Sequence, residues 1–68
     1  MNKARLFVRL VESEDGSWEL RRGCHVVVEI AAYDHALEVA TELAQLLAPS
    51  AVFVHRTDGS VTSVERFD

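Results

Sequence analysis

Glu14-Asp15-Gly16-Ser17 and Thr57-Asp58-Gly59-Ser60 are the two segments that decide the fold, because each lies between two runs of strand-forming residues. An Asp-Gly step between apolar runs is the strongest short-range sequence signal for a β-hairpin. The first segment precedes the only helix-like stretch of the chain, and the second follows it. The sequence therefore predicts a hairpin, then a helix, then a second hairpin.

The loop length of the first hairpin sets which residues pair across it. A two-residue loop would place Leu10 opposite Arg21, whereas the three-residue loop Glu14-Asp15-Gly16 places it opposite Leu20. We expect the three-residue loop, because it gathers the apolar side chains on one face and a slip of one residue would scatter them. The residues gathered in this way are Leu6, Val8, Leu10, Trp18 and Leu20.

A helix is expected over residues 35–47, where alanine and leucine recur at helical spacing. Asp34 is a good N-cap before it, because a short side-chain oxygen accepts hydrogen bonds from the first free N–H groups of a helix. Pro49 ends the helix, since the residue before a proline is disfavoured in helical geometry. The expected strands cover residues 5–12, 17–22, 26–30, 51–56 and 60–67.

These elements predict an α+β fold, in which an antiparallel sheet has the element order β-β-β-α-β-β and one helix is packed on one face. Residues 1–68 form a single small domain. Gly16 and Gly59 are expected to have positive φ angles at the two turns. The core between sheet and helix is expected to contain Leu10, Trp18, Leu20, Val28, Ile30, Ala40, Leu43 and Leu47.

A domain of 68 residues has a marginal core of its own, and such domains are reinforced by disulfides, metals or partners. Cys24 is the only cysteine, which excludes an internal disulfide, and no set of cysteines and histidines has the spacing of a structural zinc site. The expected reinforcement is a homodimer, formed either by stacked sheet faces or by paired edge strands. The apolar residues expected at its interface are Phe7, Val11, Val27 and Phe53.

The beginning of the chain is basic but does not read as an export signal. The apolar run Leu6-Phe7-Val8 is interrupted by Arg9, far short of the apolar core of a signal peptide. No stretch approaches the roughly 20 apolar residues that cross a membrane. We therefore expect a cytoplasmic protein without a membrane partner.

Basic residues gather in the first hairpin, although the net charge of the chain is −4. Lys3, Arg5 and Arg9 alternate with the apolar face of the first strand, and Arg21 falls directly across from Arg9. An aromatic residue such as Phe7 among arginines on a sheet is typical of a nucleic-acid surface. The acidic balance of the whole chain makes nucleic acid the less favoured partner. The candidate anion-binding residues are Arg5, Arg9 and Arg21.

Residues with catalytic or metal-binding chemistry are present, but they form no recognisable constellation. Cys24-His25 is a pair of neighbours in a strand, so the two side chains point to opposite faces. His35, His55 and Asp58 have ligand chemistry, but nothing in their spacing demands a metal, and Glu38 and Glu42 belong to the polar face of the helix. We therefore expect no catalytic residue, no metal, no cofactor and no enzymatic activity.

Three segments of the chain together form a pattern: Trp18-Glu19-Leu20-Arg21, the alanine-spaced stretch 36–44, and the stretch 52–61 around the second Asp-Gly step. The pattern resembles a group of very small bacterial proteins that are catalogued only as a domain of unknown function. Members of that group tend to read W-x-V-K, then E-A-x-x-x-A-x-x-x-A, then V-V-H-x-x-D-G-x-I. This chain has His35-Ala36 where the group usually has E-A. The resemblance implies a small α+β fold and implies no activity.

The function expected from the sequence is that of a small non-enzymatic protein-interaction module that self-associates. The alternative is a nucleic-acid-binding module that uses the basic face of the first hairpin. The two differ in salt dependence, because phosphate contacts weaken steeply as salt is added.

Overall fold

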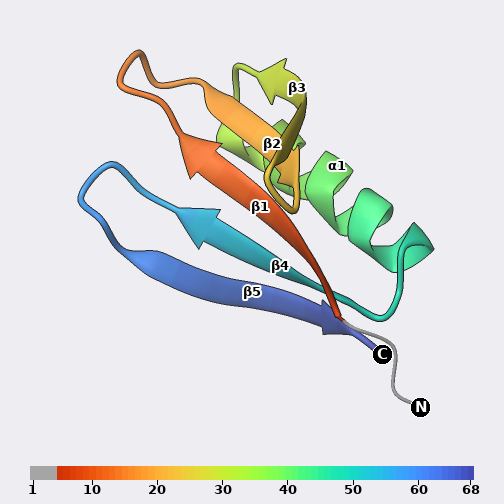
Figure 1. Ribbon diagram of the computed structural model, residues 1–68. Helices are drawn as coiled ribbons and strands as arrows, with labels where there is room; N and C mark the ends of the chain where they lie inside the picture. The colour runs from red at the N-terminus through yellow and green to blue at the C-terminus, as the bar shows by residue number, and fades with distance from the viewer. Residues whose placement is uncertain (1–4) are drawn as a thin grey trace.

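Five strands and one helix follow one another in the predicted order in the computed structural model, which describes residues 5–68 (Figure 1). Lys3 of the predicted basic face lies outside the described residues. The elements are β1 (Leu6–Glu12), β2 (Trp18–Arg22), β3 (His25–Ile30), α1 (Tyr33–Leu46), β4 (Ser50–His55) and β5 (Val61–Phe67). The α+β class, the element order and the position of the helix on one face of the sheet are confirmed.

The sheet is mixed, so the prediction of a purely antiparallel sheet is wrong. Its strand order is β3-β2-β1-β4-β5, and β1 and β4 run parallel while the other neighbours are antiparallel. The reason is the crossover, because α1 carries the chain back along the sheet and β4 then enters beside the start of β1 (Figure 1). Parallel neighbours need a long connection of this kind, and a helix usually supplies it.

The first hairpin has the predicted register of a three-residue loop. Leu10 pairs with Leu20, so both side chains point to the face that α1 covers. The predicted positive φ angles are confirmed, at 87° for Gly16 and 88° for Gly59. No atom lies within 4 Å of the place where a Cβ would stand on either glycine. Backbone conformation alone therefore favours glycine at these two positions.

The two Asp-Gly turns are built alike. The carboxylate of Asp15 accepts hydrogen bonds from the backbone N and the Oγ of Ser17, at 3.0 and 2.7 Å. The carboxylate of Asp58 accepts one from the backbone N of Ser60 at 2.8 Å. These serine contacts hold the pKa of both carboxyl groups below the ordinary value of 3.8. Each turn is thus closed by an aspartate that bonds the residue two positions on.

The parallel pairing of β1 and β4 also brings the two turns together. Oε1 of Glu12, at the end of β1, accepts a hydrogen bond from the backbone N of Thr57 at 3.1 Å and one from its Oγ1 at 3.3 Å. With β4 antiparallel to β1, the second turn would lie at the opposite end of the sheet. The mixed topology therefore ties the tips of both hairpins to each other.

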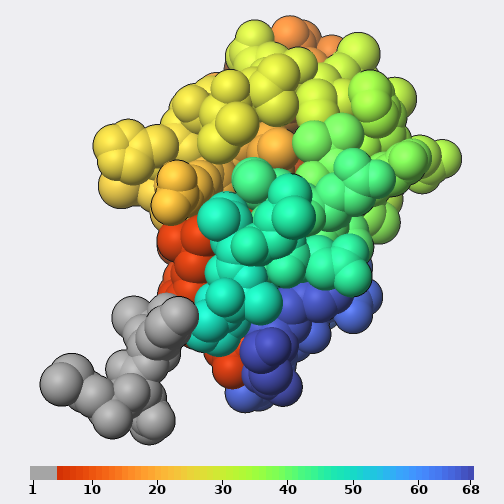
Figure 2. Space-filling view, turned by 90° about the vertical axis from the view of Figure 1, so that its right-hand side faces the viewer, coloured from red at the N-terminus to blue at the C-terminus, as the bar shows by residue number. Residues whose placement is uncertain are grey.

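Helix α1 begins at Tyr33, and its N-cap residue Ala32 makes no side-chain hydrogen bond, so the prediction of Asp34 as the N-cap is wrong. The helix thus begins two residues earlier than expected, and the ring of Tyr33 packs against Trp18, with centroids 4.8 Å apart, at its first turn. Asp34 lies in the first turn instead, where its negative charge interacts favourably with the free N–H groups at the start of the helix. Figure 2 shows the covered face, with α1 between the yellow β3 segment and the blue β5 segment. The buried helix residues are Ala36, Ala40 and Ala44.

The core lies between α1 and the central strands. Of the predicted core residues, Leu10, Trp18, Leu20 and Ala40 are buried, and Ile30, Leu43 and Leu47 are half-buried. The placement of Val28 in the core is wrong, since its side chain is 42% exposed. The reason is that β3 is an edge strand, whereas α1 packs most closely over β1 and β4. The core is completed by Val8, Val52, Val54, Ala36 and Ala44.

Candidate functional site

The sheet has one face that points away from α1 and that no described residue covers with a second layer (Figure 1). Side chains alternate between the two faces of a strand, so the strand register assigns each residue to a face. We call this surface the open face. It includes Phe7, Arg9 and Val11 of β1, Glu19 and Arg21 of β2, Val26 and Glu29 of β3, Phe53 and His55 of β4, and Val61, Ser63 and Arg66 of β5. Three of the four predicted interface residues, Phe7, Val11 and Phe53, thus share one surface.

Phe7 and Phe53 form the apolar centre of the open face. Their rings meet edge to face, with centroids 5.2 Å apart and planes at 79° to each other. Phe7 is 44% exposed, and Val61 on β5 is 56% exposed. Together with Arg9 and His55, these residues line a shallow pocket of about 170 Å³. Large apolar side chains exposed in this way make the open face the candidate interaction surface of the molecule.

Arg9 and Arg21 of the open face differ in whether a carboxylate is bound to them. Arg9 lies directly opposite Arg21, as the sequence predicted. Arg21 donates two hydrogen bonds, from Nε and Nη2, to Oε1 of Glu19 on the same strand. Arg9 forms no ion pair with any residue of the described range 5–68. Arg9 is therefore the arginine of this surface that is available to an outside group.

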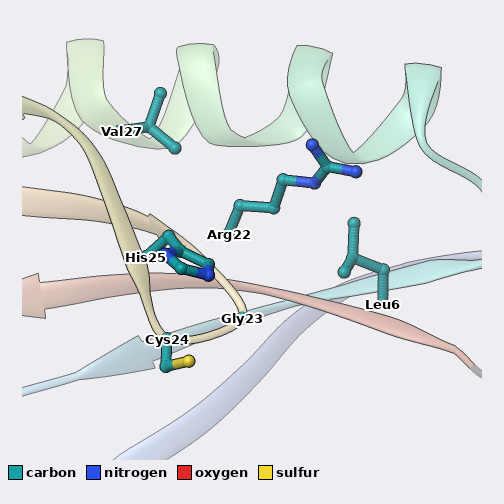
Figure 3. A pocket seen from close by; sticks show the side chains of 6 residues that line it. All are labelled: Leu6, Arg22, Gly23, Cys24, His25 and Val27. Carbon is teal, nitrogen blue, oxygen red and sulfur yellow. The ribbon is translucent and has the colours of Figure 1, made fainter.

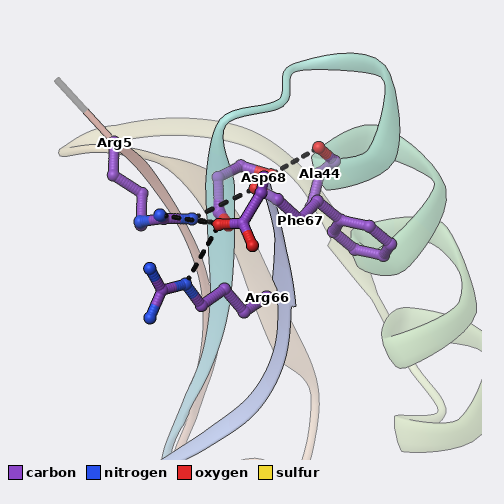
Figure 4. Close-up of polar contacts among 6 residues, drawn as sticks. Arg5, Ala44, Arg66, Phe67 and Asp68 are labelled. Carbon is purple, nitrogen blue, oxygen red and sulfur yellow. Dashed lines mark hydrogen bonds and ion pairs between the residues drawn. The ribbon is translucent and has the colours of Figure 1, made fainter. Parts of the chain in front are cut away.

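Arg5, the third candidate anion-binding residue, is occupied at the end of the sheet (Figure 4). Its guanidinium donates hydrogen bonds to the carbonyl oxygens of Ser50 and Phe67, at 3.2 and 3.1 Å. It also donates to the carboxylate of Asp68 at 2.9 Å, and Arg66 donates to the same oxygen at 3.2 Å. These bonds, with the one from Arg5 the most important, hold the pKa of Asp68 below its ordinary value of 3.8. Arg5 therefore holds the C-terminal residues against β4.

His55 lies half-buried beside the aromatic pair, opposite Val11 of β1 and Val61 of β5. Its pKa is lowered from the ordinary value of 6.5, mainly by burial and further by the positive charges of Arg9 and Arg21. No role for His55 on this surface was predicted from the sequence. The available signal was its spacing, because a residue two positions after Phe53 in a strand lies on the same face.

Val27, the fourth predicted interface residue, does not lie on the open face. It is the extra residue of a β-bulge, because Leu20 and Arg21 of β2 pair with Val28 and Val26 and leave Val27 without a partner. Its side chain therefore does not follow the alternation between the two faces of the strand. Figure 3 shows this side chain pointing toward α1, where it lines a separate pocket of about 500 Å³ with Leu6 and Arg22. The bulge was not predictable from alternation, which assumes one residue opposite one.

The residues with metal-binding or nucleophilic chemistry are not brought together. The thiol of Cys24 is exposed at the β2–β3 turn and points away from α1 in Figure 3. His35, Glu38 and Glu42 are exposed on the helix. Across residues 5–68, no group of three or more His, Cys, Asp or Glu side chains could hold a metal ion. None of the described segments is a helix of the length and apolar character that a membrane span requires.

Comparison of the chain with models of known protein families, with curated proteins and with solved structures found no match. The resemblance to a group of very small bacterial proteins therefore stays a prediction. The open face is the feature of the molecule from which a function can be inferred.

Proposed function

We propose that this protein is a small, non-enzymatic interaction module that self-associates through the open face of its sheet. The observation that supports this most strongly is the exposed Phe7–Phe53 pair on a sheet that α1 covers on one side only. Leaving an apolar sheet face in water is unfavourable, and stacking it against a second sheet removes that surface from water. A two-fold dimer is the commonest arrangement in which a chain supplies the second sheet itself.

The charges favour a second copy over nucleic acid as the occupant. The chain carries 11 acidic and 7 basic residues. On the open face Arg21 is already paired with Glu19, so few cations remain for phosphates. A two-fold interface must be self-complementary, and this face offers both the guanidinium of Arg9, which forms no ion pair within residues 5–68, and the carboxylates of Glu19 and Glu29.

The dimensions of the open face are sufficient for a weak dimer. Five neighbouring strands with a spacing of about 4.8 Å make a surface of roughly 20 by 20 Å, on the order of 400 Å² in projection. A standard interface buries about 800 Å² of accessible surface on each partner, and a projected area understates the accessible one. We therefore expect a dissociation constant on the order of micromolar rather than nanomolar.

Sedimentation equilibrium of the wild type and of Phe7→Lys tests the proposal. We expect the wild type to be dimeric at concentrations of tens of micromolar. Phe7 lies on the central strand β1, so a lysine there would place a charge inside the stacked faces and raise the dissociation constant about tenfold or more. Circular dichroism verifies that the variant is folded, and Val61→Lys provides a second, more exposed position on the same surface.

Two matched lysine variants serve as controls. Leu46→Lys changes a helix side chain that is 84% exposed, and Val27→Lys changes one that is 53% exposed on the edge strand β3. Both should leave the dissociation constant unchanged. A dimer that is lost in Val27→Lys and kept in Phe7→Lys would show that edge strands pair instead. A wild type that stays monomeric at about 100 µM would refute self-association.

Single-stranded nucleic acid is a second candidate for the same face, and Arg9 favours it, because this arginine lies beside the aromatic pair and no described residue forms an ion pair with it. Aromatic side chains on a sheet stack bases, while neighbouring arginines bind the phosphates. A mixed-sequence oligonucleotide titrated at several salt concentrations tests this candidate. Binding that falls steeply with salt and is lost in Arg9→Gln would support it, and the absence of binding at low salt would exclude it.

A further inference from the structure

His55 is a titratable side chain on the open face, so its protonation would change the charge of this surface. It is half-buried at the rim of the pocket that Phe7 and Phe53 line, on the strand next to β1. Its pKa is already lowered in the single chain, with burial as the main cause. Covering the open face with a second sheet would remove the remaining water from this imidazole and disfavour its charged form further.

Opposite His55, neither β1 nor β5 presents a negatively charged side chain that would stabilise the protonated imidazole. Arg9 on β1 and Arg21 on β2 both repel a positive charge at this position. The carboxylates of the open face lie on β2 and β3: Glu19 is already hydrogen-bonded to Arg21, and Glu29 pairs with Glu19 on the edge strand β3, on the far side of β2 from β4. On the other side, β5 presents the apolar Val61 opposite His55. Protonation would therefore add a positive charge beside Arg9 and Arg21, at a position whose partners on β1 and β5 are the uncharged Val11 and Val61.

We propose that protonation of His55 separates the two copies, so that the open face is an interface that forms at neutral pH and opens on mild acidification. This inference rests on the proposed self-association. The sign follows from linkage, because the dimer binds the His55 proton less tightly than the monomer does. Dimerisation is therefore strongest above the pKa of His55 in the single chain, which lies below the ordinary value of 6.5, and weakens as the pH falls through that lowered pKa.

Sedimentation equilibrium at about pH 7.5 and about pH 5, at constant ionic strength, tests the inference. Each dimer contains two copies of His55, so we expect the wild-type dissociation constant to rise about tenfold or more on acidification. In His55→Gln, which is neutral at both pH values, the change should fall to about twofold or less. In the matched control His35→Gln, an exposed histidine on the helix, the wild-type change should persist.

A second measurement does not depend on any variant. The His55 imidazole is titrated by NMR in a dilute sample, where the chain is monomeric, and in a concentrated sample, where it is dimeric. We expect a lower pKa in the concentrated sample, and equal values would overturn the inference. Tryptophan fluorescence of the buried Trp18 verifies that the chain stays folded across the titration.

The outcomes separate this inference from the proposed function. A wild type that is equally dimeric at both pH values, or a pH dependence that survives in His55→Gln, overturns the role of His55 and leaves self-association standing. A wild type that is monomeric at both pH values overturns both. A complex with an oligonucleotide that tightens on acidification would point to phosphates as the occupant and would likewise overturn the inference.

Discussion

Phe7 and Phe53 lie far apart in the sequence, yet their rings meet edge to face with centroids 5.2 Å apart. The parallel pairing of β1 and β4 creates this contact, because it sets Phe7 opposite Ala51 and Arg9 opposite Phe53. The aromatic centre of the open face is therefore a consequence of the helical crossover.

A double-mutant cycle measures how strongly the two rings interact within one chain. Phe7→Ala, Phe53→Ala and the double variant should give a coupling energy of about 0.5–1.5 kcal/mol, the range found for edge-to-face aromatic pairs. Urea denaturation at concentrations well below the dimer dissociation constant keeps self-association out of the measurement. Strictly additive effects of the two substitutions would show that the rings do not contact each other.

Truncation of a core leucine should be far more damaging than truncation of an exposed one. Leu20 is 1% exposed beneath α1, so Leu20→Ala should lower the free energy of unfolding by about 2–5 kcal/mol. Leu46 is 84% exposed, and Leu46→Ala should change it by no more than about 0.5 kcal/mol. Similar losses for the two variants, measured by urea denaturation, would mean that the helix packs through a different stripe.

The register of the first hairpin was predictable because burial decides between the two possible loop lengths. Only the three-residue loop, which places Leu10 opposite Leu20, keeps the apolar side chains on one face. The parallel arrangement of β1 and β4 was not predictable, since alternation along a strand is the same for parallel and antiparallel neighbours. Whether β4 pairs with β1 or with β3 depends on how α1 crosses the sheet, and that depends on the packing of the whole molecule.

The candidate site was predictable in part for the same reason. Phe7 and Arg9 alternate with the core residues of β1, so their common face followed from the sequence. The engagement of Arg5 with Asp68 joins residues 63 positions apart, and no local pattern indicates it. The place of His55 beside Arg9 likewise depends on the pairing of β1 with β4.

The turn glycines can be tested by two substitutions at one position. Gly16 has a φ of 87°, and beyond its two chain neighbours no atom lies within 4 Å of the place where a Cβ would stand, so a side chain there meets conformational strain rather than a clash. Gly16→Val should lower the free energy of unfolding by about 1–2 kcal/mol. Gly16→Asn should cost clearly less, because asparagine tolerates the left-handed conformation. Equal losses in urea denaturation for the two variants would contradict this interpretation of the turn.

Acid should destabilise the chain through the aspartates of its turns. The pKa values of Asp15 and Asp58 are held below 3.8 by hydrogen bonds from Ser17 and Ser60, so their charged forms favour the folded state. That stability is present above pH 3.8 and is lost as the pH falls through the lowered pKa values.

The double variant Asp15→Asn, Asp58→Asn keeps a side-chain oxygen at each turn but removes the titration. Its free energy of unfolding should fall less than that of the wild type between about pH 5 and about pH 2. Urea denaturation across this range gives both curves. Parallel curves would show that the two turns make no contribution to acid sensitivity.

The central claim is that a second copy covers the open face, and an isotope-filtered NOE experiment on a mixture of labelled and unlabelled chains tests it most directly. We expect contacts between copies from the rings of Phe7 and Phe53 and from the methyl groups of Val61, three residues that lie on this face. Contacts that arise instead from Val27 on the edge strand β3, or no contacts between copies at a concentration of about 1 mM, would contradict the claim.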